Sequence, residues 1–205
     1  KGGRYDVPDS GTIIKSYASF VGYGGYGGLQ DKNGVLWSSR PLLRWDTALP
    51  LTPATEDGNG NPVGPSIGPP INGLNWAGQL GDCYGLCIDS MGNVWCTQSD
   101  GNVINKYASD GTFLGGFPHG FSYAQGCVVG QNDDVWVAHS INGGGTTVGH
   151  ISNNGTFLGV VQLPPGSGPT GVAVDRLGKI WSSNFHTNSI SRIDPSLNGG
   201  VGSVD

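Results

Sequence analysis

One type of segment recurs four times along this chain, and each copy opens on glycine and closes on tryptophan. The copies begin at Gly27, Gly85, Gly126 and Gly171 and end at Trp37, Trp95, Trp136 and Trp181. In each copy an apolar run is followed by a polar turn and then by an apolar pair that includes the tryptophan. A unit of about forty residues with this pattern predicts one blade of a β-propeller, made of four antiparallel strands.

The repeat predicts an all-β fold in which the 205 residues form one propeller segment of about four and a half blades. Residues 1–26 match only the back half of a blade. The full units are 27–84, 85–125, 126–170 and 171–205, and a Pro/Gly-rich insertion at 52–75 lengthens the first of them. With 38 glycines, the chain is rich in tight turns and poor in helix formers.

This number of blades does not close a ring, and an open propeller leaves unpaired backbone groups at its edges. Three arrangements would satisfy them. The chain is a fragment of a larger propeller, or a neighbouring copy completes the missing half by strand exchange, or the units stack as an open array along a fibre.

Composition excludes several partners. The net charge is −5, only 12% of residues are charged, and no Lys/Arg cluster is present, so we expect no nucleic-acid binding. No apolar stretch approaches the roughly 18 residues of a membrane span, so we expect no membrane insertion. The scarcity of Lys and Glu, with abundant Gly, Ser, Thr and Asn, favours a secreted or cell-surface protein.

Two charged positions recur in the units. A basic residue recurs in the third strand, at Arg4, Arg44, Lys106 and Arg192, with His150 in its place in the third full unit. An aspartate recurs in the first turn, at Asp31, Asp89 and Asp175, with Gly130 in its place in that same unit. These residues form either a charged ring for an anionic ligand or structural pairs within the sheets. Repetition in every copy favours the structural interpretation.

The four cysteines include no CxxC pair and no zinc-finger spacing, which leaves disulfides or small buried side chains. Hairpin register brings Cys96 near Cys83 or Cys87, and Cys127 near Cys87 across a blade interface. The first pairing to test is therefore Cys83–Cys96 with Cys87–Cys127.

The insertion loop and the surface carry further candidate sites. Asp57, Asn59 and Asn61 alternate as at the start of a calcium loop, although Pro62 and the lack of a later Glu depart from that pattern. We expect no cofactor other than a calcium ion at this loop. Asn154 begins a glycosylation sequon. Aromatic residues near glycines could stack on glycans, which suggests a carbohydrate-binding alternative.

The segment GPTGVAVDRLGKIWSSNFHTNSISRID resembles the repeat of streptogramin B (virginiamycin B) lyase and of related NHL and SMP-30-like propellers. The shared pattern is G-P-x-G-[IV]-A-x-D-x-x-G-x-[IV]-W, then a polar patch and I-x-[RK]-[IF]. The stretches GGYGGL, SYAQGCVV and VWVAHSINGGGTTVGHIS look closer to large secreted bacterial proteins of unassigned activity. The resemblance implies a fold, and this fold carries several functions.

For a lyase, the resemblance implies an active site in the central cleft with His, Glu and a magnesium ion. The residue three after the blade tryptophan is often Glu in that family. Here these positions, our ligand-binding candidates, hold Arg40, Gln98, His139 and Asn184, and the chain's one Glu is Glu56 in the insertion. His139 and His186 remain the candidates for a metal-dependent catalytic site.

We therefore predict a non-catalytic, extracellular structural or adhesive module whose partners are copies of itself or the rest of a larger chain. The alternatives are a metal-dependent lyase or lactonase and a carbohydrate-binding module that uses the insertion.

Overall fold

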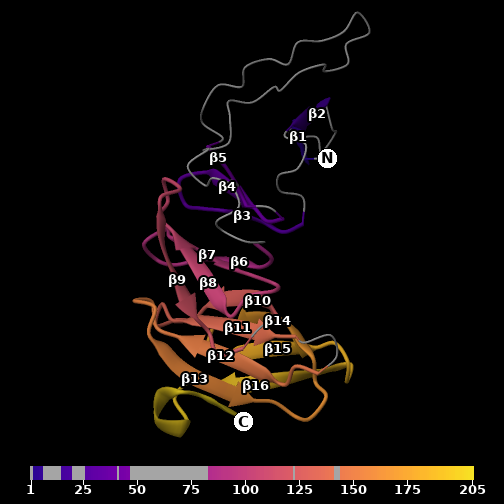
Figure 1. The fold of residues 1–205 in the computed structure, drawn as a ribbon, viewed down its shortest axis with the longest axis vertical. Helices are drawn as coiled ribbons and strands as arrows, with labels where there is room; N and C mark the ends of the chain where they lie inside the picture. Colours follow the sequence, from indigo (N-terminus) through magenta and orange to yellow (C-terminus); the bar gives the residue numbers. More distant parts are fainter. Residues whose placement is uncertain are drawn as a thin grey trace, which may run out of the picture.

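The computed structural model describes residues 2–6, 15–19, 26–40, 42–46, 83–121, 123–140 and 144–205. Within these ranges the structure is all-β, apart from a 3-10 turn at Asn198–Gly200. The described strands form five antiparallel sheets, which follow one another in chain order from one end of the molecule to the other (Figure 1).

Three of these sheets are complete four-stranded blades, with strands side by side in sequence order. The second full unit contains β6 (Leu86–Ile88), β7 (Val94–Thr97), β8 (Val103–Tyr107) and β9 (Phe113–Pro118). The third contains β10 (Ala124–Val129), β11 (Val135–His139), β12 (Thr147–Ile151) and β13 (Phe157–Gln162). The last contains β14 (Pro169–Val174), β15 (Ile180–Asn184), β16 (Ser189–Asp194) and β17 (Ser203–Val204).

The two N-terminal sheets are smaller. The first full unit shows β3 (Gly28–Gln30), β4 (Val35–Ser38) and β5 (Leu43–Asp46). The starting segment forms a two-stranded hairpin of β1 (Gly2–Asp6) and β2 (Lys15–Ser19). The predicted fold class, a partial propeller of four-stranded antiparallel blades, is confirmed, whereas the treatment of 1–205 as a single domain stays a prediction.

The insertion at 52–75 lies outside the described residues, and with it the calcium candidates Asp57, Asn59 and Asn61. In the described part of the chain, no helix has the length and apolar character needed to cross a membrane.

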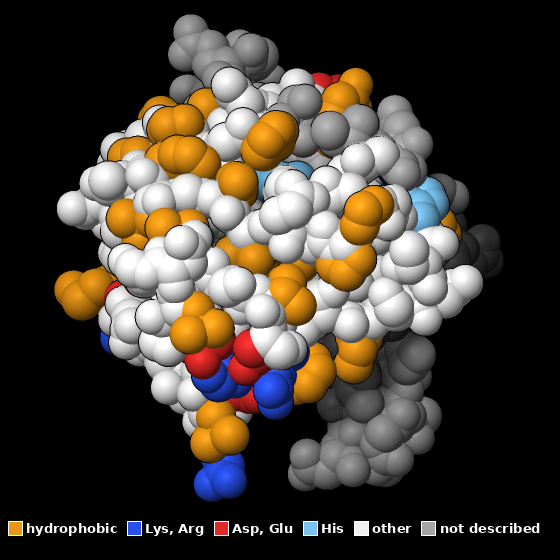
Figure 2. All heavy atoms as spheres, turned by 90° about the horizontal axis from the view of Figure 1, so that it is seen from below, with side chains coloured by type: hydrophobic (Ala, Val, Ile, Leu, Met, Phe, Trp, Pro, Cys, Tyr) orange, Lys and Arg blue, Asp and Glu red, His pale blue; other side chains and the backbone are white. Residues whose placement is uncertain are grey.

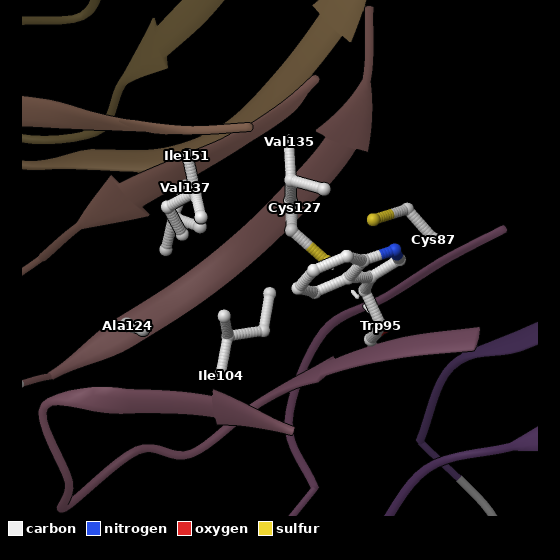
Figure 3. Close-up of a cluster of buried hydrophobic side chains, with 8 residues drawn as sticks. All are labelled: Cys87, Trp95, Ile104, Ala124, Cys127, Val135, Val137 and Ile151. Carbon is white, nitrogen blue, oxygen red and sulfur yellow. Dashed lines mark hydrogen bonds between the residues drawn. The ribbon is translucent and has the colours of Figure 1, made fainter. Parts of the chain in front are cut away.

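The hydrophobic core lies between the blades rather than within them. The repeat tryptophans of the first three full units are each at most 1% exposed, and each packs with an apolar residue in or directly before the strand beside it onto the next sheet. These pairs are Trp37 with Leu42, Trp95 with Ile104, and Trp136 with Val148. Figure 3 shows the middle cluster, where Trp95 and Ile104 pack against Val135, Val137 and Ile151 of the third unit. Burial of these large side chains is the main force that stacks one blade on the next.

Candidate functional site

A cleft of about 430 Å³ lies along the innermost strands and takes residues from all four full units, which makes it the first candidate site. The glycine that opens each unit lines it, and in the first unit its neighbour Gly28 does too; these glycines are Gly27, Gly28, Gly85, Gly126 and Gly171. A Cβ on Gly85 would lie 2.1 Å from the Gln125 backbone oxygen, and one on Gly126 would lie 2.8 Å from that of Thr170. At Gly85 and Gly126 the neighbouring inner strand approaches too closely for a side chain, whereas at Gly27 and Gly171 a Cβ would crowd the hydroxyl of Ser39 or Ser183 in the same unit.

In three of the units, the side-chain hydroxyl two residues after the tryptophan forms a hydrogen bond with the backbone of the opening glycine. Ser39, Thr97 and Ser183 accept the backbone N–H of Gly27, Gly85 and Gly171 at 3.0, 2.8 and 3.1 Å. The Thr97 hydroxyl also donates to the Gln125 carbonyl of the next blade at 2.6 Å. These bonds hold the wall of the cleft in place, so the cleft is preformed.

The mouth of the cleft carries an aromatic and cationic cluster. The hydroxyls of Tyr26 and Tyr84 are 2.8 Å apart, and their ring centroids are 4.7 Å apart. The Arg40 guanidinium carbon lies 5.7 and 4.8 Å from the two ring centroids. Such a cluster suits flat or anionic groups.

The four candidate positions three residues after the tryptophans have different surroundings. Arg40 lies at the cleft mouth, and Gln98 is half-buried beside Gly101. Asn184 is buried and donates to the hydroxyls of Ser191 at 2.9 Å and Ser189 at 3.2 Å.

His139 is buried and pairs with a residue that the sequence did not single out, His119. Nδ1 of His119 is 3.0 Å from Nε2 of His139, and Nδ1 of His139 is 2.9 Å from the Thr147 hydroxyl. Both rings are fully buried. Burial lowers the pKa of His119 to about 4, and burial followed by the nearby His119 lowers that of His139 to about 3. The pair is therefore neutral near pH 7.

His186, the second catalytic candidate, is exposed and contacts the edge of the Phe185 ring. The structure thus places His139 inside a blade interface and His186 on the surface. Among the described residues, no group of three or more His, Cys, Asp or Glu side chains is arranged to hold a metal ion.

The structure joins Cys83 to Cys96 by a disulfide, with Cα atoms 5.5 Å apart. It leaves Cys87 and Cys127 as free buried thiols, so the second of the expected pairs is not formed. Both thiols lie in the cluster around Trp95 (Figure 3). Burial, and then a hydrogen bond with Cys127, raises the pKa of Cys87, so this thiol is protonated at neutral pH.

The recurring aspartates organise the first turn of their units. Asp31 and Asp175 each accept two backbone N–H groups of their own turn, and Asp89 accepts that of Asn93. The carboxylates of Asp89 and Asp175 also accept the indole N–H of Trp95 and Trp181, at 3.2 and 2.8 Å.

The residues at the recurring basic position lie on the tryptophans, and three of the four described here reach into the next blade. Within each sheet Arg44, Lys106, His150 and Arg192 are paired across the strands with Trp37, Trp95, Trp136 and Trp181. Arg44 donates to the Ser109 carbonyl, Lys106 donates to that of Asn153, and His150 Nδ1 is 3.1 Å from that of Val201. We call these three contacts the interblade clamps, and they give the basic residues a structural role.

Asn154 is exposed in the turn before β13, where its side-chain oxygen accepts the Thr156 N–H at 3.0 Å. The sequon therefore lies on the surface, and its glycosylation stays a prediction.

Stacked four-stranded sheets around an inner cleft define this chain as a β-propeller. No protein-family model matches the sequence, and no curated protein matches it. Solved structures do match the fold. Virginiamycin B lyase from Staphylococcus aureus superposes with a TM-score of 0.68 at 17% identity, over 99% of this chain and 61% of the lyase.

A streptogramin B lyase superposes at 0.55 with 20% identity, over 92% of this chain and 70% of that one. Kuenenia stuttgartiensis hydrazine synthase superposes with a TM-score of 0.63 at 11% identity, over 95% of this chain and 51% of the synthase chain. The predicted resemblance to streptogramin-lyase-like propellers is therefore confirmed at the level of the fold. This chain spans about three fifths of the Staphylococcus lyase.

Proposed function

We propose that this chain is a non-catalytic, extracellular structural or adhesive module, and that a blade of a neighbouring copy covers the open face of β14–β17. The observation that carries the proposal is the exposure of Ile190, which is 68% accessible. The residues at the same position in the preceding units, Ile104 and Val148, are 0% accessible because the next blade covers them.

The open face repeats the strand pairing of the covered face of the third blade, although Arg192 here forms an ion pair with Asp205 of its own blade. Trp181 is paired across the strands with Arg192, and Ser183 with Ile190, as Trp136 is with His150 and Ala138 with Val148. Seen from the end of the molecule that carries β16, hydrophobic side chains are spread over much of the surface (Figure 2). Large apolar side chains such as Ile190 are exposed to water on this face, and their burial against a blade of another copy would favour association.

Three further observations support the non-catalytic and extracellular parts of the proposal. His139 is engaged with His119 and Thr147, and His186 lies apart from it on the surface. The described lining of the inner cleft is made of glycines, tyrosines, leucines and neutral polar residues with one buried cysteine. The disulfide between Cys83 and Cys96 suits an oxidising compartment.

Sedimentation velocity over a range of protein concentrations tests the assembly. We expect the wild-type chain to associate as its concentration rises and Ile190→Asp to remain monomeric. Leu114→Asp is the matched control, because Leu114 is 48% exposed on the outer strand β9. A wild-type chain that stays monomeric throughout contradicts completion by copies.

A lyase or lactonase is the second candidate, favoured by the likeness of the fold to virginiamycin B lyase. Incubation of the chain with virginiamycin B and Mg²⁺, followed by mass spectrometry, tests this candidate. Turnover that is lost in His139→Ala but retained in Asn154→Ala would favour the enzyme over the module.

A further inference from the structure

A second cavity, of about 410 Å³, lies between the third and last blades. Its walls are the first turn of the third unit, Gly130–Asp134, and two turns of the last unit around Leu177–Lys179 and Asp194–Ser196. This volume falls in the range of small-molecule sites. The cavity is separate from the inner cleft described above.

The cavity lies where the repeat departs from its pattern. The other three full units begin this turn with aspartate, whereas the third has Gly130. The backbone of the turn is retained, because the Gly130 N–H donates to the Asp134 carbonyl at 2.7 Å, as the Asp31 N–H donates to that of Val35 at 2.9 Å. The third unit therefore has the turn without its carboxylate.

The loss of the carboxylate leaves three donors without an acceptor. In the first and last units the aspartate accepts the backbone N–H groups two and four residues later, and in the last it also accepts the indole N–H. The matching groups are the N–H of Asn132, the N–H of Asp134 and Nε1–H of Trp136. All three residues line the cavity, and these groups donate to no described residue. Donors of this kind demand an acceptor from a ligand or from water.

The charges around the cavity decide which ligand fits. Asp134 contacts His150 at 3.2 Å, and Lys179 forms an ion pair with Asp194. An anion in the cavity would be repelled by the carboxylates of Asp134 and Asp194, and a cation could not accept hydrogen bonds from the three N–H donors. A neutral ligand with hydroxyl groups accepts from the donors and donates to the carboxylates. Leu177 and Pro195 add apolar surface for the C–H face of a ring.

We propose that this cavity binds a neutral sugar, with one hydroxyl in the position that the turn aspartate fills in the other units. The site is independent of the open blade face, so the chain can bind sugar whether or not it assembles.

Titration with glucose, galactose, mannose and N-acetylglucosamine tests the proposal, with the Trp136 indole N–H signal followed by ¹H–¹⁵N NMR. We expect at least one sugar to shift this signal saturably. Gly130→Asp restores the aspartate of the repeat, and it should weaken binding about tenfold or more because it supplies the acceptor itself. Thermal unfolding checks that this variant is folded.

Leu177→Ala, on the cavity wall, should also weaken binding, whereas Leu197→Ala, exposed outside the cavity lining, should not. Glucuronate, the anionic counterpart of glucose, should bind more weakly than glucose. The proposal is overturned if no neutral sugar shifts the Trp136 signal, if glucuronate binds more tightly than each neutral sugar, or if Gly130→Asp binds as tightly as the wild type.

Discussion

At the scale of single residues, the fold depends on buried polar groups that are satisfied by a partner from another strand or blade. Asp89 shows this most fully. Its carboxylate has no exposed surface, lies 3.3 Å from Lys106 Nζ, and accepts hydrogen bonds from Asn93, Trp95 and Asn153. Burial alone would raise the pKa of Asp89, but these hydrogen bonds lower it, so the group stays ionised.

Asp89→Ala should therefore lower the free energy of unfolding by about 3–5 kcal/mol, because it leaves the Lys106 ammonium buried without its counter-charge. Asp110→Ala is the control. Asp110 accepts the Thr112 N–H on the surface, and its loss should lower the free energy of unfolding much less than the loss of Asp89. Urea unfolding at pH 7 measures both, and equal losses would contradict the assigned role of Asp89.

The His119–His139 pair should make stability depend on pH. Both pKa values are lowered by burial, to about 4 and about 3, so below pH 6.5 the unfolded chain takes up protons that the folded chain does not. The free energy of unfolding should fall by up to about 1.4 kcal/mol per pH unit for each histidine between about pH 6.5 and 4.

Urea unfolding between pH 7.5 and 4.5 measures this slope. His119→Gln should reduce it, and His186→Gln, which changes an exposed histidine, should leave it as in the wild type. An unchanged slope in His119→Gln would show that the pair does not control the acid response.

At the scale of elements, the inner strands are held together by glycines that permit close approach. Gly85→Ala should destabilise the protein by about 1–3 kcal/mol, because its Cβ would lie 2.1 Å from the Gln125 carbonyl oxygen. Gly28→Ala is the matched control, since its Cβ would meet the Trp37 carbonyl oxygen at an ordinary 3.5 Å. Thermal unfolding separates the two, and equal melting temperatures would argue against crowding at Gly85.

The repeat is also what made the fold predictable. Gly, turn and Trp recur at fixed positions, so the strand order of each unit follows from local pattern. The site is less predictable. His119 follows β9 in a segment without a repeated signature, and only the packing of the second blade on the third brings it to His139.

Gly130 illustrates the same limit. Its departure from the repeat is visible in the sequence, but the cavity depends on the turn keeping its backbone and on the neighbouring turn around Leu177. Neither can be inferred from residue types alone. Cys87 and Cys127 lie in one buried cluster, yet proximity alone does not decide whether two thiols are oxidised.

At the scale of the whole molecule, stability should differ along the stack. The third strand of the third blade, β12, is buried throughout, whereas β16 in the same position of the last blade alternates between exposed and buried. At low protein concentration, backbone amides of β16 should exchange with solvent faster than those of β12. Hydrogen–deuterium exchange by mass spectrometry measures the two within one sample, and equal protection would contradict an uncovered face.

The interblade clamps have a consequence for symmetry. Arg44, Lys106 and His150 all reach from one blade to the blade that follows it in the chain. The stack therefore has a direction, and its two ends offer different chemistry. A two-fold axis would instead place two like ends against each other, which differs from every joint between blades within the chain. Growth through the joint that we propose would be head-to-tail, so it would give rings or filaments and not symmetric pairs.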